Sequence, residues 1–487
     1  MKTLISVIFF ALLFHASATA QYARVSGNAA TYAGDSLNIY QESDCISGKK
    51  INIARVAVSQ SGDFSFSVKI SSETRIFFDL TVFEGILYLR PSSNLTVVLP
   101  KKQNIRPEDE INPFFQKQPF YVNCPNASPS DLNRLIPEFD NLYTNALDKI
   151  LYSPYDVGKK RTDSLESIIR SRFITTDEFF NNYMFYRFAQ LDYTSWRRSK
   201  TDIAKQCFYN KPVLTNNPAY VELFKEIFQN PFTSGAASVV GVKGLISCMY
   251  DRSYTRLQKI LTTDKRFENQ RFADFVILKG LYDSYFADTF PPETVIAVID
   301  SFSMNSTQKD FRITASSIKD DFTRLYCGIQ PPDFRLADKD GIYKSLNDFS
   351  GKFVYLHFFN PLSYTALTDL ELLKTIRANY KSDVLEIVTI FVSSDKNEYI
   401  KFINENPDCN WPVLWYADNK TLLQDYDVSL YPLYYLIDPD SKLLMKPAPS
   451  PQEKFESEFE SALRNRRINQ SRQNNGSQTN NSLQSGY

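Results

Sequence analysis

The 487-residue sequence has no excess of charge of either sign, with 55 Lys and Arg residues against 55 Asp and Glu residues. Without a bulk charge, long-range electrostatics does not steer the protein toward nucleic acid or an anionic membrane. Beyond the first 20 residues, no stretch is long and apolar enough to span a bilayer. We therefore expect no nucleic-acid partner, and no transmembrane segment in the mature chain.

The sequence is also poor in the residues that metal and hydrolytic sites use. It contains two histidines, and only His357 lies after the first 20 residues. It has no HExxH, P-loop, GxSxG or Cys/His cluster, so zinc chemistry and Ser-His-Asp catalysis are not expected. We predict no metal and no cofactor. Because His357 lies in an apolar stretch, we predict a buried strand histidine whose hydrogen bonds are satisfied.

Closely spaced cysteine pairs are missing as well. No CxxC occurs, and the two closest cysteines are 41 residues apart. An even number of cysteines in an oxidising compartment permits disulfides, and six cysteines allow fifteen pairings. Free, buried cysteines are equally compatible with a chain of this length, so the pairing stays open. The six are Cys45, Cys124, Cys207, Cys248, Cys327 and Cys409.

Residues 1–20 have the pattern of a secretory signal peptide. Lys2 precedes an apolar run from Leu4 to Phe14, and Ala18-Thr19-Ala20 provides a small-x-small cleavage site. Residue 21 is Gln and not Cys, which favours a plain signal over a lipoprotein signal. We expect cleavage after Ala20, and a periplasmic or secreted protein.

Patterns along the rest of the chain predict three domains and a tail. Alternation such as that of 63–68 predicts a small antiparallel β-domain, a sandwich, over 21–105. Apolar residues at helical spacing predict an all-α domain over 106–325, with the aromatic run at 179–188 in its core and a binding groove as the alternative. Buried-type runs at 353–359 and 385–392 alternate with helical patterns, which predicts an α/β domain over 326–466. The Asn-, Gln- and Ser-rich residues 467–487 predict a disordered tail.

Short motifs follow one another in the α/β segment. They are Pro332-Asp333-Phe334 with Leu336, Asp340-Gly341, Ser345-Leu346 with Phe349 and Gly351-Lys352, the run 353–359, and Tyr431-Pro432 before Ile437-Asp438. Their order and spacing resemble the thioredoxin superfamily, specifically the exported TlpA/ResA branch and its AhpC/TSA relatives. The resemblance implies a thioredoxin-like fold with a cis-proline at Pro432. Together with Gly62-Asp63-Phe64-Ser65-Phe66, the domain order also resembles exported proteins common in Bacteroidetes.

The resemblance implies a reactive W-C-x-x-C after the run 353–359, and this chain departs from that pattern. Alignment on Phe358-Phe359 puts Leu362 at the Trp position and Ser363-Tyr364-Thr365-Ala366 at C-x-x-C. Thiol–disulfide exchange needs a low-pKa thiolate at a helix N-terminus and a second thiol to resolve the mixed disulfide. Serine and alanine supply neither, so we assign no catalytic residue. We predict that Ser363 caps the helix that follows.

Three functions stay open. The first is a non-catalytic protein that binds exported proteins or peptides in the groove that the family keeps beside its cis-proline. The second is a thiol–disulfide oxidoreductase that acts through displaced cysteines. The third is a structural envelope component that docks through its helical domain. We favour the first, and its predicted groove consists of Leu362, Ser363, Tyr364, Tyr431 and Pro432.

Overall fold

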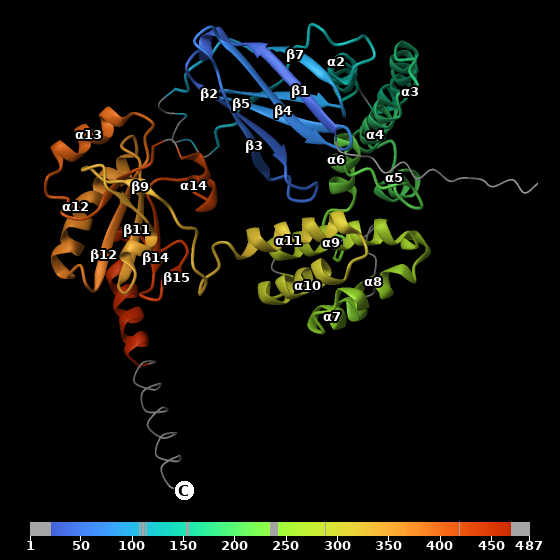
Figure 1. Cartoon of the computed structure of the whole chain (residues 1–487). Helices are drawn as coiled ribbons and strands as arrows, with labels where there is room; N and C mark the ends of the chain where they lie inside the picture. The colour runs from blue at the N-terminus through green and yellow to red at the C-terminus, as the bar shows by residue number, and fades with distance from the viewer. Residues whose placement is uncertain are drawn as a thin grey trace, which may run out of the picture. The chain divides into compact units, whose positions relative to one another are not determined.

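Figure 1 shows the computed structural model of the chain, which describes residues 21–468 apart from 107, 108, 110, 111, 113, 152–154, 234–241, 288 and 418. The described residues form two compact units. Unit 1 contains 21–104 and 117–318, and unit 2 contains 105–116 and 319–468. The predicted signal peptide lies outside the described residues. No helix among the described residues combines the length and the apolarity that crossing a membrane requires.

Two β-sheets form the first part of unit 1. In the smaller sheet, β1 (Gln21–Asn28) pairs antiparallel with β4 (Asp63–Ile70) and parallel with β7 (Asn94–Val98). The larger sheet has the order β3-β2-β5-β6-β8, with β3 (Lys50–Ala57), β2 (Ser36–Glu42), β5 (Thr74–Leu80), β6 (Phe83–Leu89) and β8 (Gln118–Tyr121). Alternate side chains of both sheets, such as Val25, Phe64 and Phe78, share one apolar core.

Two features of these sheets differ from the prediction. The pairs β1–β7 and β6–β8 are parallel, whereas we predicted an antiparallel domain. Strand β8 also lies beyond the predicted boundary at residue 105, in the stretch that we assigned to helices. It has only four residues, includes Pro119 and pairs at the sheet edge, so its sequence carries little strand pattern.

Helices make up the rest of unit 1, and their aromatic residues form its interior. Phe179, Phe180, Tyr183, Tyr186 and Phe188 are buried, which confirms the predicted core position of this aromatic run. Sheets and helices share one compact unit, so separate domains over 21–105 and 106–325 stay a prediction. The helices of this part of the chain are α2 (Leu132–Leu151), α3 (Tyr155–Arg172), α4 (Glu178–Thr194), α5 (Lys200–Cys207), α6 (Pro218–Ile227), α7 (Val242–Tyr250), α8 (Tyr254–Thr262), α9 (Gln270–Phe286), α10 (Pro292–Asn305) and α11 (Lys309–Thr323), the last of which ends in unit 2.

Unit 2 is built on a mixed sheet with the order β10-β9-β13-β12-β11-β14-β15. The central strands β11 (Phe353–Phe359) and β12 (Leu385–Phe391) are parallel and buried at every residue, because elements cover both faces of the sheet. Helix α12 (Tyr364–Asn379), α13 (Lys396–Glu405) and the helix at 455–468 pack on one face. Helix α14 (Lys420–Asp425) and η4 (Leu346–Phe349) pack on the other. The remaining strands are β9 (Leu336–Ala337), β10 (Tyr343–Lys344), β13 (Val413–Trp415), β14 (Leu433–Ile437) and β15 (Leu443–Met445).

The last helix of unit 2 corrects the predicted start of the tail. Arg467 and Ile468 continue the helix at 455–468, so the tail that we predicted from residue 467 begins at least two residues too early. The remainder of that tail lies outside the described residues.

Candidate functional site

The loop that follows β11 is fixed by a buried amide. Asn360 is buried, and its Nδ2 donates to the carbonyl of Val392, just after β12, at 3.0 Å. Its Oδ1 accepts the backbone N–H of Leu362 at 2.9 Å. One side chain therefore ties the ends of the two central strands together and sets the path of the chain into α12.

Ser363 caps α12, as predicted from the sequence. Its Oγ accepts the backbone N–H of Ala366 at 3.3 Å and donates to the carbonyl oxygen of Tyr431 at 2.9 Å. The Tyr431-Pro432 peptide is cis, as the resemblance implied. A single hydroxyl thus brings together the two segments that the sequence predicted to share a site, although they are 68 residues apart along the chain.

The predicted groove residues differ in their exposure. Leu362 and Tyr364 are exposed to solvent, whereas Ser363 is only 8% exposed. Tyr431 and Pro432 are half-buried. At the other positions that align with C-x-x-C, Thr365 is exposed and Ala366 is fully buried. Leu367 and Leu430 add further exposed apolar surface on α12 and before Tyr431. The exposed side chains of Leu362, Tyr364, Leu367 and Leu430 are called the apolar surface below.

A buried carboxylate on α12 was not predicted from the sequence. Asp369 is fully buried and accepts hydrogen bonds from the Tyr434 hydroxyl at 2.9 Å and from Gln452 Nε2 at 2.6 Å. It lies three residues after Ala366 and one before Leu370, on the inward face of the helix. A polar residue on the apolar face of a predicted helix was the available signal.

His357 is buried on β11, as predicted, but its hydrogen bonding is incomplete. Its Nδ1 lies 3.3 Å from Thr389 Oγ1, which also accepts the indole N–H of Trp411 at 2.9 Å. Among the described residues Nε2 has no partner, so the predicted satisfied histidine is wrong in this respect. Burial lowers the pKa of His357 to about 3, which keeps the ring neutral near pH 7.

None of the six cysteines lies in the Ser363–Ala366 segment, and all six are free. Burial raises the pKa of Cys45, Cys124 and Cys207 to about 12 and that of Cys409 to about 11, and it also raises the pKa of Cys248. These shifts oppose the formation of a reactive thiolate. Cys327 is exposed. Within the described residues, no group of His, Cys, Asp and Glu side chains could hold a metal ion.

Part of this chain is similar in sequence to thioredoxin-like proteins and thiol-disulfide oxidoreductases. The thioredoxin-like protein YneN of Bacillus subtilis (strain 168) is 29% identical over 112 residues, which cover 23% of this chain and 65% of YneN. The thiol-disulfide oxidoreductase ResA of the same organism is 30% identical over 117 residues, which cover 24% of this chain and 64% of ResA. Each match therefore spans less than two thirds of the relative's own length.

The comparisons with solved structures and with family models do not extend what these two relatives show. The thioredoxin domain of the thiol-disulfide oxidoreductase BVU-2223 from Bacteroides vulgatus aligns with a TM-score of 0.25 and 25% identity, over 28% of this chain and 97% of that domain. No family model matches the chain.

Proposed function

We propose that this chain is an exported, non-catalytic thioredoxin-like protein that binds extended segments of other exported proteins or peptides. Export is inferred from the signal-peptide pattern of residues 1–20, which implies a periplasmic or secreted protein. The Bacteroidetes type is inferred from the resemblance of the predicted domain order to exported proteins of that group. Binding is inferred from the surface around Ser363 and Tyr431. The alternative, a thiol–disulfide oxidoreductase that acts through displaced cysteines, needs an accessible reactive thiol.

The observation that carries the proposal is the pair of hydrogen bonds made by Ser363. In a thiol–disulfide enzyme this position needs an accessible thiolate. Here the hydroxyl is nearly buried. It accepts a hydrogen bond from the N–H of Ala366 and donates one to the carbonyl of Tyr431. It therefore holds two segments together and is not free to react. The reactive atoms are replaced, while the two segments that border the predicted groove stay joined.

The apolar surface is what a partner would cover. Tyr364 is 83% exposed, Leu430 is 57% exposed and Leu362 is 41% exposed. Full burial of one large apolar side chain contributes about 1.5–3 kcal/mol. The tyrosine hydroxyl can also form a hydrogen bond with a partner's backbone, which is one reason that tyrosine is common at interfaces. A partner that covers Tyr364 and its two leucine neighbours would gain several such contributions.

The test uses a secreted protein that has been reduced and carboxymethylated, so that it stays unfolded and has no thiol. We expect the mature chain to bind it, and Leu362→Ala/Tyr364→Ala to weaken the affinity by about tenfold or more, because two exposed apolar contacts are lost. The measurement is fluorescence anisotropy of the labelled unfolded protein.

A matched control keeps this test specific. Leu444→Ala/Tyr250→Ala removes a leucine that is 37% exposed and a tyrosine that is 66% exposed, both outside the apolar surface. This control should bind as the unaltered chain does. Absence of binding by the unaltered chain, or an equal loss in both double variants, would contradict the proposal.

A further inference from the structure

Unit 1 contains a cleft, lined about equally by polar and apolar surface, that is separate from the surface around Ser363. The β2–β3 turn, the β4–β5 turn, α6 and the start of α11 border it, and its volume is about 610 Å³. Ligand pockets in proteins commonly have volumes of about 300–1,000 Å³. Hydroxyl and amide groups line much of it, including Ser71, Thr74, Thr215 and Asn216. The cleft therefore has the size and the hydrogen-bonding capacity to hold a small polar molecule.

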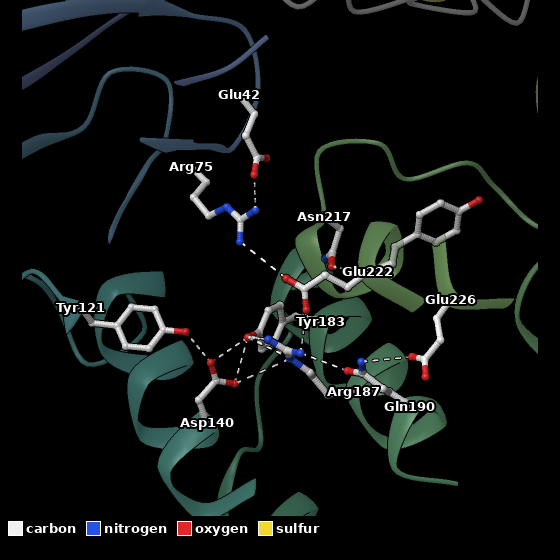
Figure 2. Close-up of polar contacts among 11 residues, drawn as sticks. Glu42, Arg75, Tyr121, Asp140, Tyr183, Arg187, Gln190, Asn217, Glu222 and Glu226 are labelled. Carbon is white, nitrogen blue, oxygen red and sulfur yellow. Dashed lines mark hydrogen bonds and ion pairs between the residues drawn. The ribbon is translucent and has the colours of Figure 1, made fainter. Parts of the chain in front are cut away.

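The acidic groups at the back of the cleft already have cationic partners. Figure 2 shows Glu222 between Arg75 and Arg187: its Oε2 accepts from Arg187 Nη1 at 2.8 Å, and its Oε1 lies 3.7 Å from Arg75 Nη1. Arg75 also donates to Glu42 Oε1 at 2.7 Å. Arg187 is held in turn by the Tyr183 hydroxyl at 3.1 Å. This network joins β2 and β5 to α4 and α6, so the wall of the cleft is preorganised.

The other acidic groups of the cleft also have hydrogen-bond donors or cations beside them. Asp310 makes a bidentate pair with Arg271, at 2.6 and 2.9 Å. Asp44 accepts two backbone N–H groups of its own turn, at 2.8 and 2.6 Å. Glu73 lies 3.8 Å from Arg90. Each carboxylate that lines the cleft thus already faces a donor.

Two lysines of the cleft are different, because neither forms an ion pair within the part of the chain that the structure describes. Lys69 is exposed near the end of β4, and Lys225 is half-buried on α6. Lys225 reaches across to the β2–β3 turn, where a Cβ built on Gly48 would lie 3.5 Å from its Nζ. Burial and the Asp44 carboxylate raise the pKa of the neighbouring Cys45, and the positive charge of Lys225 opposes them with a smaller effect.

The start of α6 adds a further positive potential. Thr215, Asn216 and Pro218 line the cleft at the N-terminus of this ten-residue helix. The helix dipole favours negative charge at such a position, although Pro218 has no N–H and the N–H of Tyr220 is already bonded to the side chain of Asn217. Within the described part of the chain, two ammonium groups without a carboxylate partner and a helix N-terminus therefore border the same cleft. Of the five acids that line it, four face an arginine and Asp44 faces backbone N–H groups.

We propose that this cleft binds a small polar ligand that carries a carboxylate or phosphate group, with Lys69 and Lys225 as its counter-ions. The hydroxyl and amide groups of the β4–β5 turn and of the segment before α6 would hydrogen-bond the rest of the ligand. This inference is independent of the function proposed for unit 2, since the cleft lies wholly in unit 1.

The test is isothermal titration of the mature chain, at low salt, with inorganic phosphate, citrate and glucuronate as separate probes. We expect at least one probe to bind saturably with a Kd below about 1 mM. Binding of phosphate alone would assign a phosphate ligand, and binding of citrate or glucuronate a carboxylate ligand. Lys225→Met and Lys69→Met should each weaken that binding by about tenfold or more, because each removes a charge-assisted hydrogen bond.

Lys101→Met is the matched control, because Lys101 is exposed, lies in unit 1 and does not line the cleft. It should leave the affinity unchanged. Thermal melting of each variant checks that it is folded, and the milder Lys225→Gln replaces Lys225→Met if the latter is not. The proposal is overturned if no probe binds saturably, or if Lys69→Met and Lys225→Met bind as tightly as Lys101→Met.

Discussion

The single histidine after residue 20 makes the pH dependence of unit 2 open to direct measurement. Folded His357 is completely buried, and burial lowers its pKa to about 3. In the unfolded chain its pKa is about 6.5. Below pH 6.5 the unfolded state therefore takes up a proton that the folded state does not, and this uptake favours unfolding. The stability that the neutral ring contributes is fully present above pH 6.5 and is lost progressively as the pH falls toward 3.

The size of the effect follows from the two pKa values. Each pH unit below 6.5 lowers the free energy of unfolding by about 1.4 kcal/mol, so we expect a loss of about 2 kcal/mol between pH 7 and pH 5. This loss adds to that from carboxylates elsewhere in the chain. Comparison with His357→Phe, which cannot be protonated and keeps a ring against Tyr434, isolates the histidine.

Urea unfolding followed by tryptophan fluorescence is the assay. Trp411 and Trp415 lie in unit 2, and Trp411 donates to the same Thr389 hydroxyl that contacts His357. Trp196 lies in unit 1 and is 84% exposed, so it contributes little change. If the unaltered chain and His357→Phe lose the same free energy of unfolding between the two pH values, the folded histidine binds a proton and the argument fails. His357→Asn serves as a second variant if the phenyl ring does not fit.

Two other predictions concern serine and cysteine. Ser363→Ala should lower the stability of unit 2 by about 1–2 kcal/mol in urea, because it removes the cap of α12 and the donor to Tyr431, whereas Ser363→Asn keeps a capping oxygen and should lose less. Equal losses would count against capping. In native protein we expect only Cys327 to react rapidly with maleimide, and no acceleration of insulin reduction by dithiothreitol. Acceleration that disappears in Cys327→Ser would support the displaced-cysteine enzyme.

Features that depend on local pattern could be predicted from the sequence. Examples are the continuous apolar runs of β11 and β12, the cap at Ser363 and the buried aromatic run of α4. Each is visible within a short stretch of sequence, from the spacing of apolar residues or from the residue type at one position. The meeting of Ser363 with Tyr431 was predicted only through the family resemblance. No local pattern relates two residues that are 68 positions apart.

Features that depend on tertiary placement could not be predicted in this way. Lys69 of β4 and Lys225 of α6 line the same cleft of unit 1, and no feature of either segment's sequence predicts this. Whether a lysine lacks a carboxylate partner is settled by long-range packing, as the pairing of Glu222 with two different arginines illustrates. The buried Asp369 is similar, because its partner Tyr434 lies 65 residues away, on another strand.

Because Ser363 at the start of α12 cannot form a disulfide, the lifetime of a complex at the apolar surface would be set differently from that of a mixed disulfide. A mixed disulfide holds its partner until a second thiol breaks the bond, so its lifetime depends on the redox poise of the compartment. Hydrogen bonds and apolar contacts end by dissociation, at a rate set by the quality of the interface. A partner held at the surface around Ser363 would therefore be released without consuming electrons, on the same timescale in an oxidising or a reducing environment.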